Sequence, residues 1–275
     1  MSAVFLLHGV ADLVGQGEHA RRGLLERAAY ERHLAERPRP FVDLDEAVGG
    51  GGDALTVDDA TRASAEAARL ARRYGHAVSL FVNPGHVEEE TPYPLYLLNA
   101  LLDAAGDRRV RYRGEGYALG EPRQKRALRR AVKGRLATLR RTERCYEVLL
   151  EVARALGTGA VELPPFLRTL TAAEVRELQE AGVRIENHGW THLDPAAFDA
   201  PQWRSDVERG RRWIERRLGT APTAYAVPFG EERPGADVAG PARTVLLHDD
   251  RLPRGAVAPG VVNRESLSLT PAGAR

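Results

Sequence analysis

The sequence contains one cysteine, Cys145, among its 275 residues. A disulfide within the chain is therefore excluded, which favours a reducing compartment. Long apolar runs are also missing: the most hydrophobic stretch, 93–105, is interrupted by a proline, an asparagine and an aspartate, whereas a bilayer span needs roughly 20 apolar residues. The first residues carry no positive charge, and the apolar run at 3–7 is shorter than the core of a secretion signal. We therefore expect a cytoplasmic protein without a membrane span.

A large excess of one charge is absent as well, because 40 lysine and arginine residues face 38 aspartate and glutamate residues and the formal net charge is +2. The whole chain is thus no polyelectrolyte partner for nucleic acid or an anionic membrane. Locally, however, residues 121–144 contain ten basic side chains against Glu121 and Glu143, a net charge of +8.

This basic segment allows two interpretations. One is a positive arm over an active site that attracts a phosphate, a nucleotide-sugar or a nucleic acid. The other is the solvated face of an arginine-rich helix, and we favour it because no aromatic residues are interleaved with the charges to stack on bases. Nucleic acid is therefore not the expected partner.

Short strand-like runs alternate with helix-like runs along the chain, which is typical of an α/β protein with a mostly parallel sheet or barrel. Helix boundaries are well signalled. Gly75 follows a predicted helix at 63–74, and capping boxes begin at Thr171 and Asp199. Strands are predicted at residues 3–7, 54–57, 77–82, 183–186, 224–227 and 244–247.

Residues 121–157 interrupt this alternation, because they are strand-free, long and helical in pattern. We predict a basic helical insertion there, within a single domain that covers residues 1–275. The glycine tract at 49–52 and the triplet at 15–17 lack the strand, loop and helix context of a phosphate-binding loop, so both are predicted to be plain loops.

Two pairs of candidate site residues follow predicted strands. Asp58 and Asp59 end an apolar strand just before a helix, and two adjacent carboxylates can divide the tasks of holding a cation and accepting a proton from water. His188 and His192 are four residues apart, so on a helical turn both imidazoles would share one face and converge on one ion. The structural alternatives are an N-cap at Asp59 and two surface histidines.

In order and spacing, these residues resemble the polysaccharide deacetylase family, also described as carbohydrate esterase family 4 or the NodB-homology group. Residues 56–60, Thr-Val-Asp-Asp-Ala, are similar to its Thr-Phe-Asp-Asp-Gly motif, and 188–192 to its His-x-x-x-His motif. Residues 226–230, Ala-Val-Pro-Phe-Gly, are similar to its Arg-x-Pro-x-Gly motif. Residues 6–10, Leu-Leu-His-Gly-Val, also resemble the opening strand of many members, and residues 78–82, Val-Ser-Leu-Phe-Val, resemble the strand after the aspartate motif. The resemblance implies an α/β fold, a distorted (β/α)7-type barrel with a helical insertion.

The resemblance also implies a role for six residues. The implied cofactor is a divalent metal ion, Zn²⁺ first and Co²⁺, Ni²⁺, Mn²⁺ or Fe²⁺ otherwise. Residues 245–249 resemble the last motif, although another interpretation makes them simply the next strand of the barrel. The implied metal ligands are Asp59, His188 and His192, the general base is Asp58, the oxyanion donor is the backbone N–H of Phe229, and the general acid is His248.

Three positions depart from the family pattern, and no counterpart of its Asp-x-x-Asp-Trp segment is present. Ala60 replaces the glycine of the first motif, and Gly189 replaces the hydroxyl residue of the second. Ala226 replaces the arginine that orients the catalytic aspartate in the polymer-acting members, so we expect Asp58 to lack that partner.

The expected activity is metal-dependent hydrolysis of an acetyl or formyl amide on an amino-sugar or related small molecule, rather than on a wall polymer, because no export signal is present. One alternative is a hydrolase of non-sugar C–N bonds on the same scaffold. The other is a non-catalytic carbohydrate- or nucleic-acid-binding protein. The intact aspartate and histidine pairs argue against the second, since binding alone needs no free carboxylate beside a metal. The sequence indicates no oligomeric state.

Overall fold

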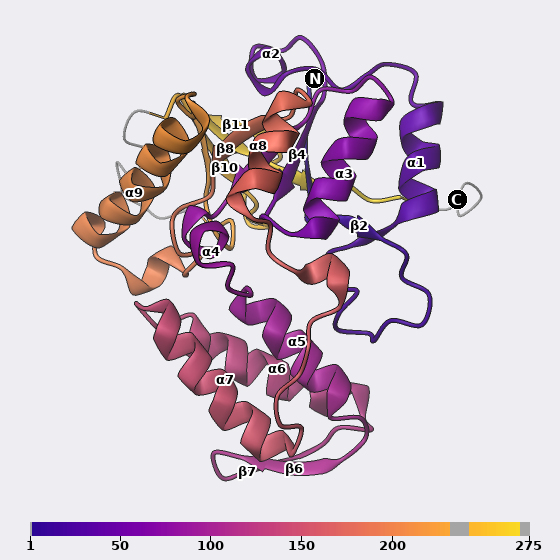
Figure 1. Ribbon diagram of the computed structural model, residues 1–275, viewed down its shortest axis with the longest axis vertical. Coiled ribbons are helices and arrows are strands. Elements are labelled where there is room, and N and C mark those ends of the chain that lie inside the picture. Colours follow the sequence, from indigo (N-terminus) through magenta and orange to yellow (C-terminus); the bar gives the residue numbers. More distant parts are fainter. Residues whose placement is uncertain (1, 232–241, 270–275) are drawn as a thin grey trace.

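The computed structural model describes residues 2–231 and 242–269. In this part of the chain nine strands form a curled sheet with helices on its outside (Figure 1). All neighbours pair in parallel except the first two in the order β11-β12-β10-β9-β8-β5-β4-β1-β13. The predicted α/β class with a barrel-like, mostly parallel sheet is therefore confirmed. The strands are β1 (Val4–Leu7), β4 (Ala54–Asp58), β5 (Ser79–Val82), β8 (Arg184–Asn187), β9 (Ala224–Ala226), β10 (Thr244–Leu247), β11 (Gly255–Ala258), β12 (Val261–Asn263) and β13 (Glu265–Ser266).

The centre of the sheet is buried on both faces. All five residues of β4 are buried, which explains why central strands of this sheet are near-continuous apolar runs rather than alternating ones. Asp58 pairs in register with Phe81 of β5, which in turn pairs with Glu186 of β8. Because these strands are parallel, their carboxyl ends meet at one edge of the sheet.

The helices pack on the sheet or below it (Figure 1). The two predicted capping boxes, at Thr171 and Asp199, are present, and a third caps α3 at Thr61. In the described residues no helix has the length and apolarity needed to cross a membrane. The helices are α1 (Arg27–Glu36), α2 (Leu44–Val48), α3 (Arg62–Arg73), α4 (Pro84–Glu89), α5 (Pro94–Ala104), α6 (Pro122–Leu136), α7 (Thr142–Leu156), α8 (Ala172–Glu180) and α9 (Ala200–Leu218), with short 3-10 turns η1 (Pro165–Leu167) and η2 (Pro195–Ala197).

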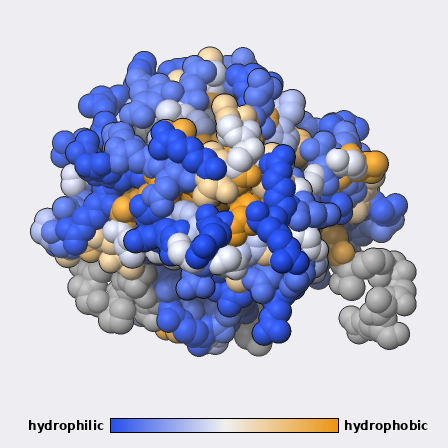
Figure 2. All heavy atoms as spheres, turned by 90° about the horizontal axis from the view of Figure 1, so that it is seen from below, coloured by the Kyte–Doolittle hydropathy of each residue, from blue (hydrophilic) through white to orange (hydrophobic). Residues whose placement is uncertain are grey.

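A separate helical layer lies below the carboxyl edge of the sheet in Figure 1. Helices α6 and α7 occupy the segment for which an insertion was predicted, but α5 and the hairpin of β6 (Arg109–Tyr112) and β7 (Glu115–Ala118) pack with them. The layer is larger than expected because these elements share one apolar core, which includes the buried Cys145. Seen from this side, the surface is mostly hydrophilic (Figure 2).

A small separate sheet is formed by two short parallel strands, β2 (Val10–Ala11) and β3 (Leu25–Glu26). The loop between them, residues 12–24, reaches down to α5, where the backbone N–H groups of His19 and Ala20 donate to the two carboxylate oxygens of Asp103. The loop is thus fixed to the helical layer.

Candidate metal and catalytic site

One cavity of about 290 Å³ lies between the carboxyl edge of the sheet and the helical layer. This volume is near the lower end of the range for small-molecule sites. Its sheet-side wall comes from residues that directly follow β1, β4, β8, β9, β10 and β12, and its other wall from α5, α6 and the 12–24 loop. The cavity is lined by all six predicted site residues, Asp58, Asp59, His188, His192, Phe229 and His248.

Three of these residues have a strained backbone. Asp59, His192 and Phe229 have positive φ angles of 66°, 52° and 64°, and in the described chain two other non-glycine residues share this feature. Such residues cost on the order of 1–3 kcal/mol each and concentrate at functional sites. The strain therefore points to this edge independently of the motifs.

Asp58 is held by an arginine that sequence analysis did not identify. Arg264, just after β12, donates from Nη1 to Asp58 Oδ1 at 2.7 Å and from Nη2 to Oδ2 at 2.6 Å. It also donates to Thr56 Oγ1 at 3.2 Å. Burial alone would raise the pKa of Asp58, but the Arg264 guanidinium, together with the His188 and His8 imidazoles, holds that pKa well below its usual range. The expectation that Asp58 lacks an arginine partner, because of Ala226, is wrong.

Asp59 is the acidic member of a possible metal site. Its Oδ1 is buried without a hydrogen-bond partner and lies 3.2 Å from Nε2 of His192 and 3.9 Å from Nε2 of His188. One ligand atom from each of the three residues lies within 4.8 Å of the others. A lone carboxylate oxygen facing two imidazole nitrogens is a donor set that divalent transition metals accept, so these residues fit a metal ion.

The other oxygen of Asp59 is fixed by α5. Tyr96 donates its hydroxyl to Asp59 Oδ2 at 2.5 Å, and both side chains are buried. The Asp59 carboxylate is therefore oriented with Oδ1 toward the histidines. Outer contacts of this kind hold the carboxylate ligands of metal sites in position.

The histidine segment is a loop and not the helical turn expected from the four-residue spacing. Gly189 and His192 both have positive φ, and Asp206 of α9 accepts from the Trp190 N–H and the Thr191 hydroxyl, each at 2.8 Å. These bonds hold the segment in a bend. His188 still reaches the site: its Nδ1 donates to the Ala226 carbonyl at 2.8 Å, so Nε2 is the nitrogen that faces the aspartates and could bind a ligand.

A buried hydrogen-bond chain joins the two motifs. The Ala60 N–H donates to the Tyr93 hydroxyl at 2.8 Å, which donates to Asn83 Oδ1 at 3.1 Å. Asn83 Nδ2 then donates to the His188 carbonyl at 2.5 Å. The aspartate and histidine segments are thus fixed relative to one another by Asn83, which directly follows β5, and by Tyr93, which directly precedes α5.

The protonation states suit metal binding. Burial lowers the pKa of His192 to about 3, although the Asp59 carboxylate opposes the shift. Burial would raise the pKa of Asp59, but the facing imidazoles and the Tyr96 hydroxyl hold it below its usual range. Near neutral pH the group therefore contains a carboxylate and a neutral His192 imidazole, which are the forms that bind metals.

The remaining candidates lie farther around the cavity. The Phe229 ring centroid is 5.4 Å from that of His192. His248 directly follows β10, as the interpretation of a further barrel strand predicted, and its Nε2 is 3.0 Å from Ser266 Oγ. Burial, followed by the nearby Arg264, lowers the pKa of His248, so its neutral form predominates near pH 7. His8 also lines the cavity, after β1.

Sequence comparison identifies the family. The sequence model of the polysaccharide deacetylases matches residues 51–239, more than half of the chain, and the chain belongs to this family. No curated protein matches.

Solved deacetylases share the fold. A Streptococcus pyogenes deacetylase, PplD, in complex with acetate has a TM-score of 0.59 and 11% identity, with 96% of this chain and 91% of that chain covered. A de-N-acetylase from Aggregatibacter actinomycetemcomitans has a TM-score of 0.56 and 13% identity, with 98% of this chain and 96% of that chain covered. IcaB from Ammonifex degensii has a TM-score of 0.54 and 14% identity, with 97% of this chain and 92% of that chain covered. At these identities the likeness concerns the fold.

Proposed function

Since the chain is a member of the polysaccharide deacetylase family, we propose that it is a metal-dependent hydrolase that removes an acetyl or formyl group from the nitrogen of an amino-sugar or a related small molecule. The observation that carries this proposal is Asp59 Oδ1, a buried acceptor without a hydrogen-bond partner that faces two imidazole nitrogens beside a second, separately held carboxylate. One carboxylate is thus available for a metal and the other for proton transfer.

Asp59, His188 and His192 would hold the ion. Once bound, a divalent metal such as Zn²⁺, or Co²⁺, Ni²⁺, Mn²⁺ or Fe²⁺, polarises a carbonyl and lowers the pKa of water. Asp58 is the proposed general base. Arg264 keeps Asp58 ionised and fixes the plane of its carboxylate. Its Oδ2, which lies 3.8 Å from Nε2 of His188, would accept the proton of the attacking water.

Two further groups complete the proposed reaction. The Phe229 N–H would donate to the carbonyl oxygen as negative charge develops on it. His248 would donate a proton to the departing amine, and because its neutral form predominates beforehand, that proton must reach it during turnover. The products are a free amine and acetate or formate.

The proposal is tested by mass-spectrometric screening of N-acetyl- and N-formyl-amino-sugars, nucleotide-sugars and aminoglycoside precursors, with elemental analysis of the same sample. Asp58→Asn should retain the metal and lose a factor of about 10² to 10⁴ in rate, whereas Asp59→Ala should lose the metal. Glu147→Gln, which alters an exposed ion pair with Arg144 outside the cavity, is the control and should change neither.

Several outcomes would overturn these assignments. Metal loss in Asp58→Asn with full retention in Asp59→Ala would show that the two roles are reversed. Full activity in both variants would exclude the proposed chemistry. Turnover confined to non-sugar amides would make the protein a hydrolase of other C–N bonds. His248→Ala should lower the rate without metal loss, and a larger loss in His8→Ala would assign proton donation to His8.

A further inference from the structure

The cavity wall opposite the sheet is basic. Arg129 and Lys133 of α6 and Arg22 of the 12–24 loop line it. The Lys133 ammonium lies 5.3 Å from the Phe229 ring centroid, and that ring is 5.4 Å from the His192 imidazole. One aromatic ring therefore contacts both the cation and a predicted metal ligand, so the basic wall and the candidate metal site belong to one small cavity.

These cations have little compensation from acidic side chains. Among the described residues neither Arg129 nor Lys133 has a carboxylate partner; the Arg129 Nε donates to the neutral amide oxygen of Asn99 at 2.8 Å. Arg22 has a loose ion pair with Glu18 at 3.7 Å, and its buried Nε has no hydrogen-bond partner. Buried donors of this kind are normally satisfied, so an acceptor from outside the chain is expected here.

The acids of the cavity cannot supply that acceptor. Asp58 accepts at both oxygens from Arg264, and Asp59 accepts at Oδ2 from Tyr96 while its Oδ1 faces the two histidines. Burial, and then repulsion from Arg22, lower the pKa of Arg129. Two guanidinium groups that repel one another across a cavity wall would both be stabilised by an anion between them.

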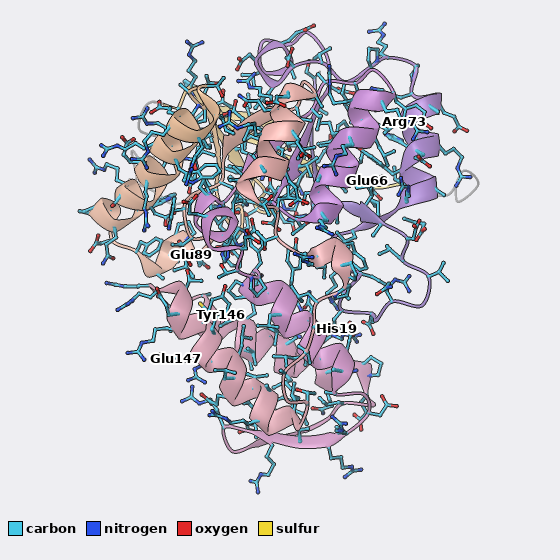
Figure 3. All side chains as sticks on the ribbon, in the orientation of Figure 1. His19, Glu66, Arg73, Glu89, Tyr146 and Glu147 are labelled. Carbon is cyan, nitrogen blue, oxygen red and sulfur yellow. The ribbon has the colours of Figure 1, made fainter. Side chains whose placement is uncertain are left out.

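The cationic wall is held in place by packing. Leu128 and Val132, each one position before a cavity-lining cation, are buried in the core of the helical layer and fix the face of α6. The Arg22 loop is fixed by His19, which lies beside α5 in Figure 3 and whose Nδ1 is 3.0 Å from Asp103 Oδ1. The three cations are thus carried by two ordered elements.

We propose that Arg22, Arg129 and Lys133 form a subsite for an anionic group, a phosphate or a carboxylate, that the substrate carries beside its N-acyl group. The inference rests on the proposed function, because one molecule would occupy both parts of the cavity. It also divides the basic segment between its two interpretations: Arg129 and Lys133 line the cavity, whereas Arg130 lies outside it and is a solvated charge of the same helix.

Binding of inorganic phosphate to metal-stripped protein, measured by titration calorimetry after the chelator has been dialysed away, tests the subsite without hydrolysis. Arg129→Gln and Lys133→Gln should each weaken binding about tenfold, the effect of one charge-assisted hydrogen bond. Lys125→Gln and Arg130→Gln remove a charge from the same helix outside the cavity and should bind like the wild type. Acetate, tested in parallel, shows whether a carboxylate or a phosphate binds more tightly.

The kinetic arm uses the metal-loaded enzyme with N-acetylglucosamine, its 1-phosphate and N-acetylmuramic acid. An anionic substrate should have the higher kcat/KM, and the ratio to the neutral sugar should fall about tenfold in Arg129→Gln and Lys133→Gln. Phosphate binding that depends on both residues, without hydrolysis of any amino-sugar, would retain the subsite and reject the proposed function. Hydrolysis with no phosphate binding, or with equal effects of all four variants, would reject the subsite and retain the function.

Discussion

Replacing Arg264 with methionine should lower the free energy of unfolding by about 3–5 kcal/mol, because it leaves a buried carboxylate without its counter-charge. The side chains of Arg264 and Asp58 are 1% and 3% exposed. The guanidinium donates to both carboxylate oxygens within 2.7 Å. The imidazole of His188 is farther away, with its Nε2 at 3.8 Å from Asp58 Oδ2, and does not replace these two hydrogen bonds. Methionine keeps most of the apolar volume, so the loss reports the charge rather than a cavity.

The pH dependence of stability should change sign in this variant. In the wild type the pKa of Asp58 is below the ordinary value of 3.8, so its contribution to stability is present above that pH and is lost as the pH falls toward the folded-state pKa. Without Arg264, burial raises the pKa of Asp58 above its unfolded value. The folded state then binds the proton more tightly, and stability falls as the pH rises above about 4.

Urea unfolding followed by tryptophan fluorescence between about pH 2 and pH 7, with a chelator present, measures both effects, because the contribution of Asp58 in the wild type is lost only below its ordinary pKa of 3.8. Arg135→Met breaks a partly exposed ion pair with Glu151 and should cost at most about 1 kcal/mol. Adding Asp58→Asn to Arg264→Met should recover much of the loss. The argument would be refuted if the free energy of unfolding of Arg264→Met lay within about 1 kcal/mol of the wild-type value and changed with pH in the same way.

Two other variants test how the site is held. Tyr96→Phe removes the hydroxyl that orients Asp59 and should weaken metal affinity about 10- to 100-fold; Tyr146→Phe, whose hydroxyl donates to a carbonyl away from the cavity, should leave it unchanged in a competition assay with a metal indicator. Gly189→Ala should destabilise the protein in thermal unfolding by about 1–3 kcal/mol, since φ is +78° and the added Cβ would lie 2.7 Å from Oδ2 of Asp206. Gly134→Ala, in a helix with open space around it, should stabilise slightly, and equal effects of the two alanines would contradict this reasoning.

The sheet could be predicted from the sequence because its strands have no solvated face. Each predicted strand is a short apolar run, and in a parallel sheet covered on both sides such runs need no alternation. The residues that follow them, Asp58, Asp59 and His188, were therefore expected at one edge, and they line one cavity there. Helix starts at Thr171 and Asp199 were equally accessible, because capping is a local interaction.

Arg264 could not be predicted because nothing local distinguishes it. It is 206 residues from Asp58 and follows a strand of three residues, β12, which the sequence analysis did not identify. The pairing of β12 with β10 brings the arginine to the carboxyl edge of the sheet. The sequence did contain one indication of it. Because Ala226 supplies no cation, a buried Asp58 needs a counter-charge from another part of the chain.

The histidine segment shows a different limit. A four-residue spacing is compatible with a helical turn, yet two imidazoles can also converge from a bend, and the choice depends on Asp206 of α9, 15 residues beyond Thr191. The basic segment is similar. The pattern predicted a cationic helix, but the packing of Leu128 and Val132 in the helical layer decides which cations face the cavity.

The departures from the family pattern concern groups that the backbone or another element supplies. Ala226 contributes its carbonyl oxygen to His188, and any residue type has that atom. The arginine missing at this position is replaced by Arg264, which reaches Asp58 from another strand. Under the proposed function Asp58 binds a proton and Asp59 an ion, and no backbone group can substitute for either side chain. The departures at Ala226 and the retained aspartates are therefore consistent with one site, because only the geometry, and not the chemistry, can be supplied from elsewhere.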